Sequence, residues 1–407
     1  MEEWKFYKMS DFIDFNPTVS LKKGTVARKI TMDRLIPHSR DIYDWEYEPY
    51  SGGAKFQNGD TIMARITPCL ENGKHAFVSI LDDGEIAYGS TEYIVMRGIP
   101  GVSDNRFVYY LSHYSDFKNA AIKSMVGSSG RQRAQIDVLK NLEFYLPSLD
   151  EQKRIADALS ILDDKIALNN RINHNLEEQA RTLYKSWFVD FEPFKEGDFV
   201  DSDQGLIPKG WRIGTLSDLG DIVGGGTPSK AKPEYYTNNG IAWLTPKDLS
   251  LKCKKFTAKG EIDITECGYK NSSAKLMPRG SVLFSSRAPI GYISIAKGGI
   301  CTNQGFKSVI PRHAGTAYIF YWLCENTDSI EANASGSTFK EASGSLMKSF
   351  PALIPSRDVL EAFEAEIMPI LNEQEYLEEE ISYTEQLRDL LLPRLMSGEL
   401  LFDDLTS

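Results

Sequence analysis

The sequence has no long apolar run and no paired cysteines. No stretch approaches the roughly 18 apolar residues that a membrane-spanning helix needs, and the N-terminal "MEEWKFYKMS" has no apolar signal core. The five cysteines are an odd number without a C-x-x-C pair, which argues against a disulfide framework and a structural zinc. We therefore expect a cytoplasmic protein without a membrane segment, whose cysteines are single, buried and reduced.

Motifs for catalysis are also missing. There is no G-x-x-x-x-G-K-[ST] motif, which excludes a nucleotide-driven motor in this chain. The "NPT" at 16–18 lacks the aromatic residue of an adenine-methyltransferase tetrapeptide. "PSLDEQK" (147–153) has the residue order of a nuclease site, but its acids fall on the first turn of an expected helix, where they favour the helix dipole. We expect no catalytic site, metal or cofactor.

The net charge of −11 would argue against nucleic acid if it were spread evenly. It is not, because residues 357–407 hold three basic and fourteen acidic side chains, whereas residues 193–356 hold 19 basic and 15 acidic ones. Residues 1–148 are close to neutral, with 18 basic and 19 acidic side chains. The two larger blocks therefore remain free to bind an anion such as DNA.

The chain contains an internal repeat. Trp4 is followed by "MSDF" and Trp211 by "LSDL", while "GDTIMARITP" (59–68) matches "GSVLFSSRAP" (280–289) and "YLPS" matches "LIPS" further along. Each copy is rich in short β-like runs and ends in a helical segment. Between the copies, residues 193–210 are polar and punctuated by Gly and Pro, which is typical of a linker.

The two helical segments carry matching heptad seams. Apolar residues recur in steps of four and three from Ile155 to Trp187, and again 208 residues later. The first seam is polar at Asn169 and Asn173, and the second at Gln374 and Thr384; at each of these positions the other seam is apolar. A buried Asn fixes register and discourages self-pairing. We predict a mixed antiparallel pair with both asparagines near its centre; the alternative is that each helix packs only on its own domain.

The same segments contain helix start signals. Ser148 with Glu151 is a capping box, and Ser160 with Asp163 is a weaker one. Pro369 corresponds to the residue after Ser160, and proline is favoured at the first helical position. These signals predict that each segment restarts, giving a short helix and then a long one over 161–190 and 369–397.

Four stretches carry a family resemblance: "EQKRIADALSILDDKIALNNRINHNLEEQARTLYKSWFVDFEPF" (151–194), "LEEEISYTEQLRDLLLPRLMSGEL" (377–400), "GDIVGGGTPSK" (220–230) and "NQGFKS" (303–308). Over nearly the whole chain the sequence resembles the specificity (S) subunit of type I restriction-modification systems. The resemblance implies two target-recognition domains, each reading half of a bipartite site in double-stranded DNA, held apart by antiparallel helices. It also implies that two methyltransferase subunits dock on the helices and that nuclease-translocase subunits join them. The first copy lacks "GGGTPSK" and "NQGF", as expected of a domain that reads a different sequence.

The expected fold is α+β, with two β-rich recognition domains in tandem repeat separated by a coiled-coil pair of long helices. The expected boundaries are domain one at 1–148, the first helical region at 149–192, the linker at 193–210, domain two at 211–356, the second helical region at 357–400 and a tail at 401–407.

Candidate DNA contacts are Arg, Lys and amide side chains in polar loops, because guanine edges suit Arg and adenine edges suit Asn or Gln. The candidates are Arg28, Lys29, Arg65, Asn72, Arg131, Arg133, Thr227, Lys230, Lys247, Arg287, Asn303, Gln304 and Lys340. "VGGGTPSK" is either a phosphate-cradling loop or a plain turn. Bulky residues near the segment ends are candidates for methyltransferase docking, although Trp187 also fits the seam: Leu183, Trp187, Phe188, Leu392 and Met396.

Two other classes of protein stay open from the residues alone. One is a coiled-coil adaptor that binds only proteins. The two large, neutral-to-basic β-rich domains disfavour this class. The other is an autonomous DNA-modifying enzyme, which the missing motifs disfavour.

Overall fold

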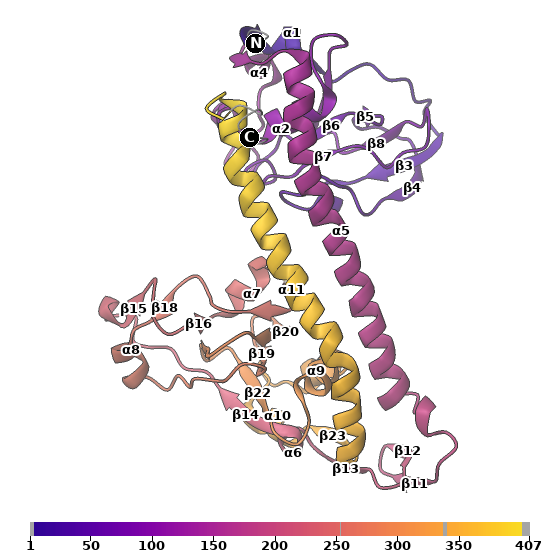
Figure 1. The fold of residues 1–407 in the computed structure, drawn as a ribbon, viewed down its shortest axis with the longest axis vertical. Helices are drawn as coiled ribbons and strands as arrows, with labels where there is room; N and C mark the ends of the chain where they lie inside the picture. The colour runs from indigo at the N-terminus through magenta and orange to yellow at the C-terminus, as the bar shows by residue number, and fades with distance from the viewer. Residues whose placement is uncertain (1–3, 253, 337–339, 401–407) are drawn as a thin grey trace. The chain divides into compact units, whose positions relative to one another are not determined.

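The computed structural model describes residues 4–252, 254–336 and 340–400 (Figure 1). The chain forms two compact units, one made of residues 1–168 with 380–407 and the other of residues 169–379. Two 40-residue helices, α5 (Leu149–Phe188) and α11 (Arg357–Met396), contribute to both units. Within the described ranges no helix is long and apolar enough to cross a membrane.

The first unit contains two four-stranded sheets. An antiparallel sheet has the order β2-β9-β6-β7, and a mixed sheet has the order β4-β3-β8-β5 with β3 and β8 parallel. A separate antiparallel pair, β1 with β10, joins the two ends of the recognition segment. The strands are β1 (Lys5–Lys8), β2 (Ile13–Phe15), β3 (Val26–Ile30), β4 (Glu46–Pro49), β5 (Lys55–Phe56), β6 (Thr61–Ala64), β7 (His75–Phe77), β8 (Ala87–Gly89), β9 (Tyr93–Gly98) and β10 (Glu143–Leu146).

Helices cover the antiparallel sheet of the first unit. Helix α2 begins after Asp104, whose carboxylate accepts the backbone N–H groups of the first turn, as an N-cap should. Phe107 of α2, Leu159 of α5 and Leu395 of α11 are buried in one core, so both long helices belong to it. The helices are α1 (Met9–Phe12), η1 (Met32–Arg34), α2 (Asn105–His113), α3 (Ser115–Lys123) and α4 (Ile136–Lys140).

The second unit is built on a five-stranded sheet of order β14-β22-β19-β20-β17, with four two-stranded pairs around it. Its strands are β11 (Phe199–Ser202), β12 (Gly205–Pro208), β13 (Arg212–Thr215), β14 (Gly220–Gly224), β15 (Tyr236–Thr237), β16 (Trp243–Leu244), β17 (Phe256–Thr257), β18 (Asp263–Ile264), β19 (Val282–Ser286), β20 (Ile290–Ala296), β21 (Cys301–Thr302), β22 (Lys307–Pro311) and β23 (Pro351–Ile354). Its helices are η2 (Glu192–Phe194), α6 (Leu216–Leu219), η3 (Pro233–Tyr235), α7 (Pro246–Lys252), α8 (Glu266–Lys270), α9 (Thr316–Asn333) and α10 (Gly344–Ser349).

The predicted repeat is confirmed. The pair β1–β10 has its counterpart in β13–β23, both antiparallel and both leading into a long helix. The repeated "MSDF" and "LSDL" motifs form the short helices α1 and α6. The matched "GDTIMARITP" and "GSVLFSSRAP" segments form β6 and β19, and each is followed by a cis proline, at Thr67–Pro68 and Ala288–Pro289.

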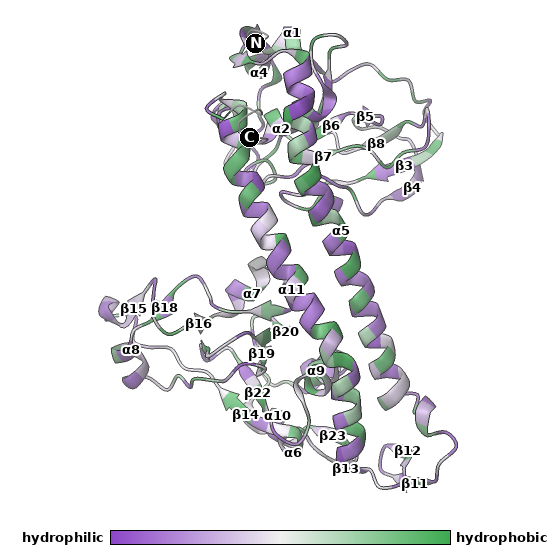
Figure 2. Cartoon of the chain, in the orientation of Figure 1, coloured by the Kyte–Doolittle hydropathy of each residue, from purple (hydrophilic) through white to green (hydrophobic). Residues whose placement is uncertain are grey.

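The antiparallel pairing of α5 and α11 is confirmed in each unit separately. In the first unit Asp163 contacts Arg388 and Lys165 contacts Glu380, so rising numbers on α5 meet falling numbers on α11. In the second unit the Asn173 carbonyl accepts from Gln374, and the ring of Tyr184 lies against that of Phe363. Figure 2 shows hydrophobic and hydrophilic residues alternating along both helices, as paired amphipathic helices require.

The predicted helix restarts are wrong, because α5 and α11 each run through them without a break. Pro369 removes one helical hydrogen bond, a cost of about 3 kcal/mol. Phe363, Ile367 and Leu371 around it are buried, and their packing offsets that cost. At the predicted restart in α5, the Ser160 hydroxyl accepts from Tyr110 instead of capping a helix. The start after Ser148 is confirmed, but its hydroxyl has no hydrogen-bond partner among the described residues, so the capping box does not form.

Candidate functional site

In both copies of the repeat, a loop late in the domain is hydrogen-bonded to the backbone just before the cis-proline turn. In the first unit the backbone N–H of Ala134 donates to the Arg65 carbonyl at 2.8 Å, just before the turn at Pro68. In the second unit the N–H of Ala342 donates to the Ser286 carbonyl at 2.9 Å, just before the turn at Pro289. The residues that precede these alanines, Arg133 and Glu341, therefore occupy matching positions with opposite charges.

The first cluster is centred on Arg133. Its guanidinium contacts both carboxylate oxygens of Glu92 at 2.6–3.0 Å, and this hydrogen bonding holds the pKa of the Glu92 carboxyl below its usual range. Arg65 lies on the same turn, since its backbone N–H donates to the Glu92 carbonyl at 2.9 Å. Arg131 and Asn72 are exposed beside it, Asn72 four residues after Pro68. Four of the six predicted residues of the first domain therefore gather here.

The second cluster is centred on Glu341. Its carboxylate accepts from Lys307 at 3.2 Å and from Arg287 at 3.4 Å. Lys307 also reaches the Gln304 carbonyl at 3.5 Å, and the Gln304 side chain is hydrogen-bonded to Thr227. Asn303 lies next to Gln304, with its side-chain oxygen turned inward to the N–H of Gly305. Lys307 and Glu341 are not among the contacts predicted from the sequence, although "NQGFKS" contains Lys307.

The glycine-rich stretch forms a packed turn. The N–H groups of Gly225 and Gly226 donate to the carbonyls of Phe306 and Thr302, at 3.4 and 2.8 Å. A Cβ on Gly225 would lie 1.9 Å from the Asn303 carbonyl oxygen, so only glycine fits this backbone-to-backbone approach. These two N–H groups are occupied and cannot cradle a phosphate, which favours the plain-turn reading of this stretch.

Other predicted contacts lie apart from both clusters. Arg28 on β3 is only 8% exposed, and its guanidinium binds Tyr47, Asp82 and Glu85. Lys29 pairs with Glu48 at 2.7 Å, so β3 uses both cations to hold its neighbours. Lys247 on α7 is exposed and lies 3.5 Å from Glu261. Lys230 is exposed in the turn before η3, and Lys340 reaches the Glu331 carbonyl.

The predicted docking side chains belong to the cores. Phe188, Leu392 and Met396 are buried and do not form an exposed face, and their role in docking stays a prediction. Leu183 and Trp187 are partly buried against the core of the second unit. The reason is that all five lie on or next to the seam, where the helices pack on each other and on the recognition segments.

Exposed apolar residues do occur on the helices, at positions that were not predicted from the sequence. In the first unit Ile161 and Leu168 on α5 are 67% and 42% exposed, and Tyr383 and Leu390 on α11 are 68% and 59% exposed. Each pair is spaced by seven residues and lies one position before a seam residue. That spacing was the available signal, because it repeats a bulky apolar side chain on a face that the partner helix does not cover.

In each unit a cation from the recognition segment reaches the long helices. Arg40 contacts Asp164 of α5 at 2.6 Å and the Ser160 carbonyl at 3.4 Å. Lys255 contacts Glu177 of α5 and lies 2.8 Å from the Gln374 side-chain oxygen on α11. Gln374 is thus polar on the seam because it serves this cation as well as the Asn173 carbonyl.

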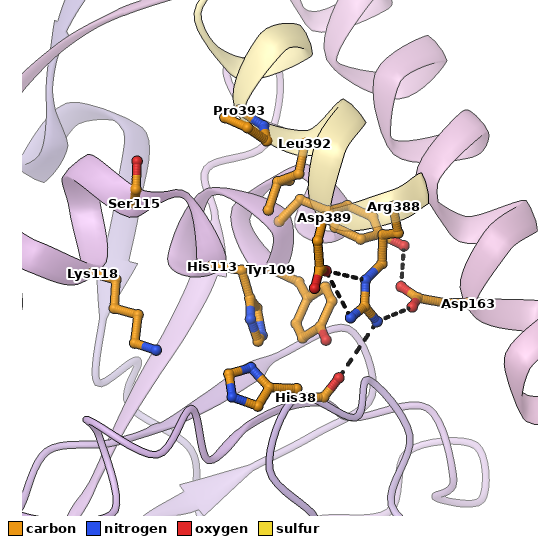
Figure 3. A pocket seen from close by; sticks show the side chains of 11 residues that line it. His38, Tyr109, His113, Ser115, Lys118, Asp163, Arg388, Asp389, Leu392 and Pro393 are labelled. Carbon is orange, nitrogen blue, oxygen red and sulfur yellow. Dashed lines mark hydrogen bonds and ion pairs between the residues drawn. The ribbon is translucent and has the colours of Figure 1, made fainter. Parts of the chain in front are cut away.

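A pocket of about 230 Å³ lies in the first unit, between α2, α3, α11 and the loop of His38 (Figure 3). Arg388 lies in its wall, bound to Asp163 at 2.7 Å and to Asp389 at 2.9 Å. The other wall carries His113 and Lys118. Among the described residues no group of three His, Cys, Asp or Glu side chains could hold a metal ion.

Comparison with known proteins decides the family. The model described as the type I restriction modification DNA specificity domain matches residues 1–178 and 208–381, one match for each copy of the repeat. The chain belongs to this family. It is therefore the specificity subunit of a type I restriction-modification system, a non-catalytic component that recognises DNA.

Individual relatives of this chain are described as type I restriction enzyme specificity subunits. The chain is 25% identical to the type I restriction enzyme HindI specificity subunit of Haemophilus influenzae, over 98% of this chain and 100% of that protein. It is 38% identical to the MjaIX specificity subunit of Methanocaldococcus jannaschii, over 40% of this chain and 38% of that protein. The crystal structure of the type I restriction-modification S subunit from M. genitalium has the same fold, with a TM-score of 0.57 at 14% identity over 97% of this chain and 96% of that chain.

Proposed function

We propose that this specificity subunit reads an asymmetric bipartite site in double-stranded DNA. Domain one (1–148) reads one half-site and domain two (211–356) reads the other. The single observation that carries the proposal is the pair of equivalent turns, which present Arg133 in one copy and Glu341 in the other. A symmetric pair of readers recognises a palindrome, whereas two diverged copies in one chain recognise two different half-sites.

The chemistry of the two clusters differs in the way that unlike half-sites require. An arginine suits the O6 and N7 acceptors of guanine, and a carboxylate accepts from the N4 amino group of cytosine. Arg133 and Glu341 are both partly exposed and both preoriented by an ion pair, with Glu92 and with Lys307 respectively. The proposed surfaces are Arg65, Asn72, Arg131 and Arg133 in domain one, and Thr227, Arg287, Asn303, Gln304, Lys307 and Glu341 in domain two. The other predicted contacts stay predictions outside these two surfaces: Arg28, Lys29, Lys230, Lys247 and Lys340.

The test changes one cluster at a time. In the complex with methyltransferase subunits, Arg133→Gln should relax or alter a base in one half-site, and Glu341→Gln a base in the other, because one good base contact is worth about 1–3 kcal/mol of discrimination. Sequencing of the methylated sites is the measurement. Lys23→Gln, an exposed cation outside both clusters, is the control. Two variants that alter the same half-site, or none, would contradict the proposal.

We further propose that two methyltransferase subunits dock on the long helices, and that nuclease-translocase subunits join through them. In the first unit the exposed apolar residues Ile161, Leu168, Tyr383 and Leu390 supply the contact area that such a dock needs. The double variant Tyr383→Ser/Leu390→Ser should elute as the free chain in gel filtration with the methyltransferase. Gln386→Ser, an exposed change on the same helix, should co-elute like the wild type. Co-elution of the double variant would refute this face.

A further inference from the structure

On one side of the pocket of the first unit the polar side chains have partners, and on the other side they lack them (Figure 3). On the satisfied side Arg388 is neutralised by Asp163 and Asp389. On the other side the described residues offer no carboxylate within ion-pair distance of Lys118 and no hydrogen-bond partner for the buried Nε2 of His113. Figure 3 shows the side chains of Lys118, His113 and His38 pointing toward one another. The His113 Nε2 is buried without a hydrogen-bond partner, and the partly buried Lys118 beside it has no acid, so this side of the pocket calls for an anionic ligand.

The electrostatic surroundings of this side are positive. Burial lowers the pKa of Lys118, and no neighbouring acid opposes it. Burial, then His75, Arg388, His38 and Lys118 lower the pKa of His113. The pKa of His75, whose ring lies 4.6 Å from that of His113 at a tilt of 51°, falls to about 3 through burial and then Lys118 and His38. Only His38 feels an opposing acid, Asp389, beside burial, Lys118 and Arg388.

The side chain of His38 is held in place for this pocket. Its backbone has φ +63°, a conformation that residues other than glycine rarely adopt, and its N–H donates to the Gly73 carbonyl at 3.0 Å. The ring packs on Gly73, where a Cβ would lie 2.6 Å from it. Arg388 reaches the His38 carbonyl at 3.4 Å. The nine-residue helix α3 begins at Ser115 in the same wall, and its N-terminal partial charge adds to the positive potential.

We propose that this pocket binds a phosphate-type oxyanion, held by the Lys118 ammonium and the imidazole N–H groups of His38 and His113. The anion gives Lys118 the counter-charge it lacks and gives His113 Nε2 an acceptor. The phosphate belongs either to the DNA backbone or to a free phosphate-bearing small molecule. The proposal does not depend on the base-reading clusters, because it uses none of their residues.

Titration calorimetry of the full chain with inorganic phosphate tests the proposal, with chloride at equal ionic strength as the blank. The expected result is saturable binding with a dissociation constant on the order of 1 mM or tighter. Lys118→Gln should weaken it at least tenfold, and so should His38→Asn, since asparagine tolerates the same backbone conformation. Lys123→Gln, an exposed lysine on the same helix, should bind like the wild type.

A second readout keeps the test independent of the stability of any variant. On adding phosphate to the wild-type chain, the imidazole C–H resonances of His38 and His113 should shift, and that of His174 on α5 should not. An unchanged spectrum, no saturation at ten times the expected dissociation constant, or equal binding by Lys118→Gln and Lys123→Gln would overturn the proposal.

A salt titration of DNA binding then distinguishes the two sources. If the anion is a DNA phosphate, Lys118→Gln reduces the salt dependence of binding by about one counterion and free phosphate competes with DNA. If it is a small molecule, DNA binding is unchanged while the calorimetric site remains. Failure of base reading by Arg133 or Glu341 would leave both results unaffected.

Discussion

Lys255→Met tests how the second recognition segment is fixed to the helices. The Lys255 ammonium is paired with Glu177 and lies 2.9 Å from the Tyr321 hydroxyl and 2.8 Å from the Gln374 side-chain oxygen. Its side chain is 11% exposed and that of Glu177 is 19% exposed. The variant keeps most of the apolar stem and removes the charge, so it isolates this network from packing.

The structure sets the magnitude. Removing one partner of a buried ion pair costs about 3–5 kcal/mol. Glu177 keeps a second partner, Arg181 at 2.7 Å, although that guanidinium is 54% exposed and therefore weakly effective. We expect the free energy of unfolding of the second unit to fall by about 2–3 kcal/mol.

The loss should depend on pH with a defined sign. Burial opposes ionisation of Glu177, but the charge of Lys255 and its hydrogen bond, together with Arg181, outweigh burial and lower its pKa. A lowered pKa of an acid gives stability that is present above its unfolded pKa, near 4.5, and is lost as the pH falls through the folded pKa. The difference between wild type and variant should therefore shrink below pH 4.5.

Urea denaturation of the full chain is the assay, with Trp187, Trp211 and Trp322 reporting on the core of the second unit. Lys259→Met, an exposed control, should change stability by less than about 0.5 kcal/mol. The double variant Lys255→Met/Glu177→Gln should lose less than the sum of its single variants. A loss within 0.5 kcal/mol for Lys255→Met, or strict additivity of the double variant, would refute the reasoning.

Three further predictions concern the helices. Asp163→Asn should lower the free energy of unfolding of the first unit by about 3 kcal/mol, because Arg388 loses its buried partner. Adding Arg388→Met should restore part of that loss. Burial raises the pKa of Glu378 against its backbone donors, so wild-type stability falls as the pH rises through that pKa; Glu378→Gln should flatten this profile, and parallel melting curves would contradict it. Seven residues inserted after Leu168 and after Glu379 lengthen each helix by about 10 Å, so methylated sites should gain about three spacer base pairs, whereas an out-of-phase insertion of three residues should not be tolerated.

The repeat and the antiparallel helices could be predicted because both produce periodic patterns in the sequence. A displacement of 208 residues relates the seams, and complementary polar positions such as Asn169 and Gln374 mark a mixed pair. The break at Pro369 was predicted wrongly, since local propensity does not contain the packing of Phe363 and Leu371 that overrides it.

Long-range partners set the limit for the candidate site. The residues near Arg28 in the sequence do not predict its ion pairs with Asp82 and Glu85, so Arg28 was predicted to be available for DNA. Glu341 was not predicted as a DNA contact, because an acid becomes a candidate only when the fold shows it at the position equivalent to Arg133. The same holds for Lys255, whose partners lie on two helices far away in the chain.

The central claim is that two domains of one chain read two unlike half-sites independently. The most direct measurement replaces residues 205–356 with the matching segment of another specificity subunit and sequences the sites methylated by the complex. We expect one half-site to change while the other half-site and the spacer length stay as they were. A change in both half-sites, or in neither, would contradict it.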